Sequence, residues 1–217
     1  MDADLVEAMV GVLEAKDFST AAHTWRVILY TRAMAEAADL DPDRVRRLTF
    51  AAALHDVGKV DIPDAIILKP GPLTHDEFEV MKTHAAAGHA RLLAMEETDE
   101  IVLTLVRHHH ERWDGLGYPD GLAGEAIPPG PRYFAVIDSF DAMTSVRPYR
   151  HDVGPEAGRR AIDELLAGSG TRYCPDAVDR FVRLYRRGDL DWIMEHFNDR
   201  CAVPDYRELV TLDRFRA

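Results

Sequence analysis

Apolar residues recur at intervals of three and four along almost the whole chain, and this period is the strongest constraint on its fold. Such spacing gathers apolar side chains on one face of an α-helix, whereas strands would show strict alternation, of which there is almost none. With 217 residues, 47% of them hydrophobic, the chain can bury one substantial core. The sequence therefore predicts an all-α protein, a single-domain helical bundle.

Residues that favour helix ends divide this pattern into segments. Asp41-Pro42 offers a cap followed by proline at the first helical position, and Thr74 with Glu77 forms a capping box. Gly58 lies where a helix is expected to stop. We expect helices over residues 2–15, 19–38, 42–57, 75–92, 99–110, 132–144, 155–167 and 175–187. Residues 113–131 are too rich in Gly and Pro for helix or strand and predict a long ordered loop.

Charge and composition exclude several classes of protein. The net charge is −12, and the basic residues form no block, so we expect no nucleic-acid polymer as a partner. Cys174 and Cys201 are the only two thiols, which argues against a disulfide framework or a Cys-based zinc site. Because no basic and apolar leader and no membrane-spanning apolar run is present, we expect a cytoplasmic protein without membrane contact.

Imidazoles and carboxylates gather at helix ends and on apolar faces, where they need partners. A metal site would satisfy them together, and nitrogen and carboxylate donors without thiolate favour Fe or Mn over structural zinc. An adjacent His-Asp pair would let one carboxylate bridge two ions, which suits phosphoester hydrolysis. The candidate ligands come from five segments: His23, His55, Asp56, His84, His109, His110 and Asp138.

Each ligand also has a simpler interpretation. A single helical histidine is more often a core or surface residue than a ligand, and histidine is common at helix C-termini because of the dipole. Asp138 could be a buried carboxylate capped by a neighbour, and Asp141 could equally be the carboxylate that matters. Lys59, Arg147 and Arg150 could contact substrate phosphates or, for the arginines, form salt bridges on an acidic surface.

Several long motifs resemble the HD-GYP domains, the cyclic di-GMP phosphodiesterase branch of the HD superfamily of metal-dependent phosphohydrolases. The resemblance covers roughly residues 15–185. It rests on four stretches in the family's order and spacing, with "GTRYCPDAVDRF" as a closing segment: "HDVGK", "IPDAIILKPGPLTHDEFEVMKTH", "HHERWDGLGYPDGL" and "VIDSFDAMTSVRPYR".

The resemblance assigns roles residue by residue. It implies a catalytic domain over residues 1–188. Residues 189–217 lie beyond the resemblance, and their apolar residues predict a helical tail that packs on the body or on a second copy. The same seven candidate ligands would hold two divalent ions in the centre of the bundle, with Asp56 bridging them. Lys59, Arg147 and Arg150 match positions that contact substrate phosphates, so that Asp56 and Lys59 are the expected catalytic pair. Gly117, Tyr118 and Pro119 form the signature tripeptide.

The implied reaction is hydrolysis of cyclic di-GMP to pGpG or GMP by a metal-bound hydroxide. Some members carry a glutamate four residues before the first ligand histidine, which supports a third metal; Ser19 stands there, so we expect two. Two alternatives stay open. The domain could bind cyclic di-GMP or a diguanylate cyclase through its Gly-Tyr-Pro loop without catalysis, or it could hydrolyse another cyclic dinucleotide or nucleotide. A homodimer is also an open alternative.

Overall fold

The computed structural model describes residue 11 and residues 20–145 and 155–196. The described residues form α-helices and two short 3₁₀ helices, with no strand among them and only two isolated β-bridges. The elements are α2 (Thr20–Ala37), α3 (Pro42–Leu54), η1 (Val57–Asp61), α4 (Asp64–Ile67), α5 (His75–Ala94), α6 (Glu100–His108), η2 (Gly124–Ala126), α7 (Pro129–Thr144), α8 (Pro155–Ala167), α9 (Pro175–Arg187) and α10 (Asp191–His196). The all-α prediction is confirmed.

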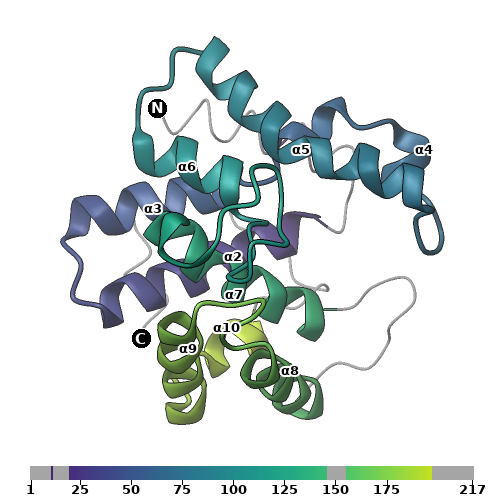
Figure 1. Ribbon diagram of the computed structural model, residues 1–217. Helices are drawn as coiled ribbons and strands as arrows, with labels where there is room; N and C mark the ends of the chain where they lie inside the picture. Colours follow the sequence, from purple (N-terminus) through teal and green to yellow (C-terminus); the bar gives the residue numbers. More distant parts are fainter. Residues whose placement is uncertain (1–10, 12–19, 146–154, 197–217) are drawn as a thin grey trace.

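Helix α2 runs through the middle of the molecule (Figure 1). It contacts α3, α7, α9 and α10, and residues 24–31 are buried in an unbroken run. A helix buried over consecutive residues is surrounded on every side, unlike a surface helix with one apolar stripe. Trp25, Ile28 and Tyr30 in this run are fully buried. The core therefore forms around α2, and His23 lies directly before this buried run.

The remaining helices pack in two groups on either side of α2. Helices α3, α5 and α6 form one group, since α3 contacts α6 and α6 contacts α5. Helices α7, α8 and α9 form the other. Helices α8, α9 and α10 lie in the lower part of Figure 1. Leu190 and Ile193 belong to the same core as α2, so the described start of the predicted tail packs on the body. The division at residue 188 stays a prediction, because residues 197–217 lie outside the described part.

Most helix boundaries agree with the sequence signals. Asp41 caps α3 with Pro42 in its first turn, and Thr74 and Glu77 form both hydrogen bonds of the capping box on α5. One boundary prediction was wrong: α3 ends at Leu54 and not near Gly58. Gly58 lies in η1, which packs on α5, and a Cβ there would lie 2.0 Å from the backbone oxygen of His84. The glycine is needed for this close approach and not for the helix end.

The predicted loop over residues 113–131 is ordered. Apart from η2 and the first turn of α7 it contains neither helix nor strand. The amide of Asp114 donates to the carbonyl of Thr171 at 2.8 Å, and the amide of Trp113 donates to that of Arg172 at 3.1 Å. The loop is thus attached to the connection between α8 and α9. Among the described residues, no helix combines the length and apolar character needed to cross a bilayer.

The capping box on α5 gives a test of local stability. We expect Thr74→Ala to lower the free energy of unfolding by about 1 kcal/mol, because the amide of Glu77 loses its acceptor. Urea unfolding followed by circular dichroism measures the change. Thr83→Ala in the middle of the same helix is the matched control and should change the free energy by less than about 0.5 kcal/mol. Equal losses in the two variants would contradict a role for the capping box.

Candidate metal centre

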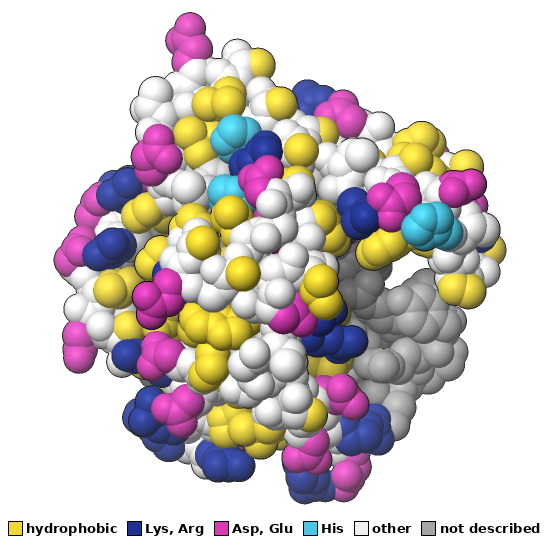
Figure 2. Space-filling view, in the orientation of Figure 1, with side chains coloured by type: hydrophobic (Ala, Val, Ile, Leu, Met, Phe, Trp, Pro, Cys, Tyr) yellow, Lys and Arg dark blue, Asp and Glu magenta, His cyan; other side chains and the backbone are white. Residues whose placement is uncertain are grey.

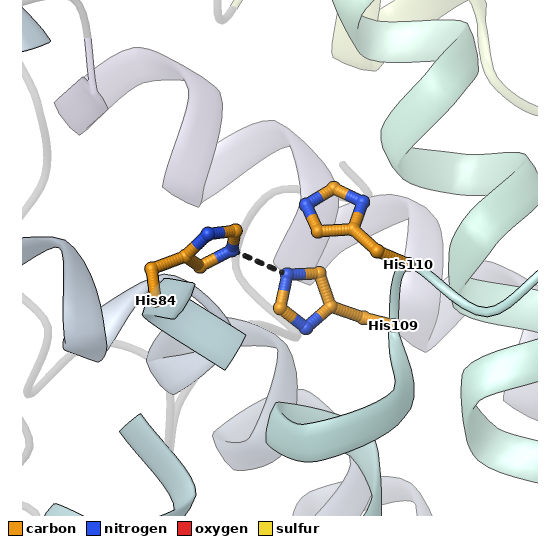
Figure 3. A group of neighbouring side chains, drawn as sticks. All are labelled: His84, His109 and His110. Carbon is orange, nitrogen blue, oxygen red and sulfur yellow. Dashed lines mark hydrogen bonds between the residues drawn. The ribbon is translucent and has the colours of Figure 1, made fainter. Parts of the chain in front are cut away.

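Four elements bring the predicted histidines together at one end of the α2, α3, α5 and α6 group. His23 lies in α2, His55 and Asp56 follow α3, His84 lies in α5, and His109 and His110 follow α6. They form two groups, each with its ligand atoms within 4.8 Å of one another: His84, His109 and His110, and His23, His55 and Asp56. Figure 3 shows the first group, with the ring of His84 directed at that of His109.

Three of these rings are oriented by the helix that carries them. The Nδ1 atom of His55 lies 2.8 Å from the carbonyl of Ala52, and that of His84 lies 2.8 Å from the carbonyl of Met81. His109 repeats the arrangement, with Nδ1 2.9 Å from the carbonyl of Val106. A carbonyl can only accept, so Nδ1 is the donor in each case. In the neutral ring, Nε2 then carries a lone pair that points away from the helix.

The ring of His23 is oriented in the same way, but by a side chain and not by a backbone carbonyl. Its Nδ1 lies 2.8 Å from Oδ2 of Asp141, which as a carboxylate accepts the hydrogen bond. Asp141 is fully buried and also accepts from the Arg26 Nε atom at 2.6 Å and from the Ser145 hydroxyl at 2.9 Å. Although burial raises the pKa of Asp141, the Arg26 charge and the His23 hydrogen bond outweigh it and hold the pKa well below its usual range.

The lone pairs of these rings face one another in pairs. Nε2 of His84 lies 3.2 Å from Nε2 of His109, and Nε2 of His23 lies 3.3 Å from Nε2 of His55. Two acceptors at this distance repel unless a cation or a proton lies between them. Two nitrogens about 2.1 Å from one ion and at right angles lie about 3 Å apart, which matches both pairs. The donor set therefore fits metal binding.

Burial keeps the histidines of the first group neutral. It lowers the pKa of His110 to about 4, and burial together with the neighbouring His110 and His84 holds the pKa of His109 well below its usual range. Burial also lowers the pKa of His84, and Asp56 opposes only part of this shift. Metal ligands must be deprotonated, so these histidines are ready to bind at neutral pH.

Asp56 lies between the two groups. Its Oδ2 atom is 3.1 Å from Nε2 of His55, and its Oδ1 atom is 3.4 Å from Nε2 of His84. The ammonium of Lys59 is 2.6 Å from Oδ2. Burial raises the pKa of Asp56, but His55 and Lys59 outweigh it and the net pKa is well below the usual range. One ionised carboxylate thus presents an oxygen to each histidine group, as a bridging ligand must.

Asp138 and Asp141 occupy different sides of His23. Oδ1 of Asp138 lies 3.6 Å from Nε2 of His23, whereas Asp141 contacts Nδ1. The side chain of Asp138 is 19% exposed and that of Asp141 is fully buried. Asp138 therefore faces the side where a metal would bind, and Asp141 orients the histidine from behind. The two aspartates that the sequence left as alternatives therefore contact different nitrogens of His23.

The loop that carries the signature tripeptide Gly117-Tyr118-Pro119, the signature loop, is held beside the histidines by two carboxylates. The buried side chain of Glu111 accepts hydrogen bonds from the amides of Asp120 and Leu122 at 2.8 and 3.0 Å. Asp120 in turn receives two hydrogen bonds from Arg107, both 2.7 Å long. A Cβ on Gly117 would lie 2.4 Å from the amide nitrogen of Arg112, so only glycine permits this path. The loop thereby places Tyr118 with its ring centroid 4.9 Å from that of His110.

Three positions named in the sequence analysis lie outside the described residues, and the histidine next to His109 belongs to the loop contacts. Ser19, Arg147 and Arg150 lie outside the described residues. His108 contacts Asp120 of the loop through Nε2 at 2.9 Å and belongs to neither histidine group.

Sequence reasoning missed the residues that support the ligands: Arg26, Glu111, Asp120 and Ser145, with Asp141 weighed only as an alternative to Asp138. The one available signal was Arg26 itself, a charged residue within an apolar helical run that must be buried if that run is. Its partners are 115 and 119 positions away, and no spacing rule connects them.

Comparison with known proteins identifies the family of this chain. The profile of the HD domain family matches residues 7–177. A cyclic di-GMP phosphodiesterase from Thermotoga maritima is 42% identical over 187 residues, which are 83% of this chain and 49% of that protein. The cyclic di-GMP phosphodiesterase response regulator RpfG from Xanthomonas campestris is 39% identical over 93% of this chain and 52% of its own. The chain therefore belongs to the HD domain family, and within it to the HD-GYP type.

A solved structure shows the same fold. The crystal structure of a cyclic GMP-AMP specific phosphodiesterase from V. cholerae superposes with a TM-score of 0.65 at 19% identity, over 87% of this chain and 50% of that one. The chain spans about half the length of the curated relatives it matches. HD phosphohydrolases depend on metal, and the described residues include two groups that could bind it.

The different roles of the two aspartates can be tested by stability. In protein stripped of metal with a chelator, we expect Asp141→Asn to lower the free energy of unfolding by about 3 kcal/mol or more, because it removes the buried charge that faces Arg26. Asp138→Asn is the matched control, and its partly exposed carboxylate should contribute less than about 1 kcal/mol. Urea unfolding gives both values. Similar losses in the two variants would refute the division of roles.

Proposed function

We propose that this domain is a metal-dependent phosphodiesterase that hydrolyses cyclic di-GMP to pGpG or GMP. The observation that carries the proposal is the pair of histidine groups, each with facing Nε2 lone pairs, joined by the carboxylate of Asp56. Relatives at 42% and 39% identity are cyclic di-GMP phosphodiesterases, which supports the substrate. The proposal extends to a cytoplasmic location, where a bacterial second messenger would be met.

The proposed cofactors are two divalent ions, Fe or Mn, as the nitrogen and oxygen donors favour. His23, His55 and Asp138 would hold one, and His84, His109 and His110 the other, with Asp56 shared between them. When bound, such a pair polarises a phosphoryl oxygen and lowers the pKa of water at the site. We expect two ions and not three because Ser19 offers no carboxylate.

The side chains of the domain then have separate tasks. Asp56 holds the two halves of the site together, and Lys59, beside it, supplies a positive charge for a substrate phosphate. We propose that Arg147 and Arg150 bind the remaining phosphate oxygens through their guanidinium groups. Asp141 and Arg26 keep the His23 ring in the orientation that directs Nε2 inward. No protein nucleophile is required.

One observation favours cyclic GMP-AMP as an alternative substrate. The similar solved structure belongs to a phosphodiesterase specific for cyclic GMP-AMP, so the same fold serves a different base in another protein. A non-catalytic domain that binds cyclic di-GMP, or a diguanylate cyclase at the Gly117-Tyr118-Pro119 loop, is the other alternative. The rates of hydrolysis of cyclic di-GMP and cyclic GMP-AMP, measured under the same conditions, distinguish the two substrates from each other and from a domain without catalysis.

The first test is anaerobic incubation of the protein, loaded separately with Fe(II) or Mn(II), with cyclic di-GMP. We expect pGpG or GMP only in metal-loaded samples that hold about two ions per chain. Chromatography follows the products, and elemental analysis gives the metal content. Faster hydrolysis of 3′3′-cyclic GMP-AMP would reassign the substrate. Two bound ions without turnover of either compound would reject the phosphodiesterase and favour the binding domain.

Asp56 is the residue whose loss should affect both halves of the site. We expect Asp56→Ala to reduce bound metal to below one ion per chain and to lower turnover by a factor of about 10³ or more. Asp61→Ala is a matched control, because its exposed carboxylate pairs with Arg91 on the surface. Retention of full activity by Asp56→Ala would refute the proposed bridging role.

A further inference from the structure

Phe78 is an exposed aromatic side chain near the metal centre. It lies in the first turns of α5 and is 46% exposed. Together with α4, these turns project from the body on the right of Figure 1, and Figure 2 shows hydrophobic and charged side chains on this projection. Single exposed aliphatic residues are common and need no explanation. Phe78 is the only aromatic one among the exposed large hydrophobic residues of the described part: Leu68, Phe78, Val80, Leu93, Met95, Leu116 and Leu166.

Tyr118 connects Phe78 to the histidines. Its ring centroid lies 4.9 Å from that of His110 and 6.4 Å from that of His84. On its other side, the centroid of Phe78 lies 6.4 Å away, with the two rings almost perpendicular at 89°. The rings of His110, Tyr118 and Phe78 therefore follow one another outward from the centre. This series joins the signature loop to the exposed end of α5.

Lys82 lies beside the two outer rings. It follows Phe78 by one helical turn, so both side chains lie on the same face of α5. The ammonium nitrogen lies 5.7 Å from the centroid of Phe78 and 5.9 Å from that of Tyr118, within the range of cation–π attraction. Glu79 accepts from the same ammonium at 2.7 Å. The exposed ring of Phe78 thus has two neighbours, Tyr118 and Lys82.

This surface suits the part of a nucleotide that a metal centre does not hold. A phosphate at the histidines leaves its ribose and base to extend over the neighbouring surface. Base stacking on an exposed aromatic ring is favourable for every base, because each has a π-face.

We propose that Phe78 is a stacking platform for one nucleobase of the cyclic dinucleotide, with the almost perpendicular ring of Tyr118 bordering the edge of that base and Lys82 beside both rings. The proposal rests on the proposed function and deepens it, because it names the residues that hold the base while the metal centre holds the phosphate. Phe78 is then a positioning residue for the substrate and takes no part in the chemical step.

Binding of GMP to Mn(II)-loaded protein tests the platform without any turnover. We expect Phe78→Ala to weaken GMP binding about tenfold, as measured by calorimetry, because stacking on one ring is lost. Phe78→Tyr should bind as the parent protein does, whereas Phe78→Leu should resemble Phe78→Ala, since it keeps apolar area without a π-face. Binding of ribose 5-phosphate, which has no base, should be the same in all of them.

Leu93→Ala is the matched control, because Leu93 lies on the same helix and is 49% exposed. Its GMP binding should equal that of the parent protein. If the parent hydrolyses cyclic di-GMP and Phe78→Ala binds GMP without loss, the platform is wrong and the proposed function stands. If Phe78→Ala weakens GMP binding but the parent has no turnover, the platform stands and the phosphodiesterase is rejected. Absence of GMP binding in the parent protein overturns the platform.

Discussion

The hydrogen bonds of the histidine Nδ1 atoms are the constraint on which the rest of this site depends. Three of these bonds end at carbonyls of the same helix and the fourth at Asp141, so four of the five rings are oriented before any ligand binds. Each bond assigns the proton to Nδ1 and leaves a lone pair on Nε2. In the buried centre, Nε2 lone pairs then face one another and repel. A divalent cation between them would remove this repulsion, because it binds both nitrogens as ligands.

A buried ion pair links the candidate site to the core. Helix α2 is surrounded on all sides, and a charged residue in such a helix requires an ionised partner. Arg26 finds it in Asp141 on α7, and that carboxylate also orients His23 one turn earlier on α2. The same carboxylate on α7 therefore pairs with the buried charge of α2 and sets the orientation of the candidate ligand His23. On the opposite side, Glu111 and Asp120 hold the signature loop, which gives the first histidine group an aromatic neighbour in Tyr118.

Much of this could be predicted from local sequence. The helices, the caps at Asp41 and Thr74 and the irregular course of residues 113–131 follow from residues within a few positions of one another. Gly58 was misread because the same residue favours a helix end and a close backbone contact, and only the position of α5 distinguishes them. The different tasks of Asp138 and Asp141 were not separable either, because both lie on the same helix within one turn.

The sequence by itself determined the helical class, the set of imidazoles and carboxylates and the motifs that identify the family, because these depend on local spacing and residue type. Only the tertiary structure decided which nitrogen of each histidine faces inward, which aspartate stands behind His23, and that an exposed Phe78 adjoins the signature tyrosine. These features join residues that are up to 118 positions apart. They depend on how helices pack and where each side chain finds its partner, which no local pattern records.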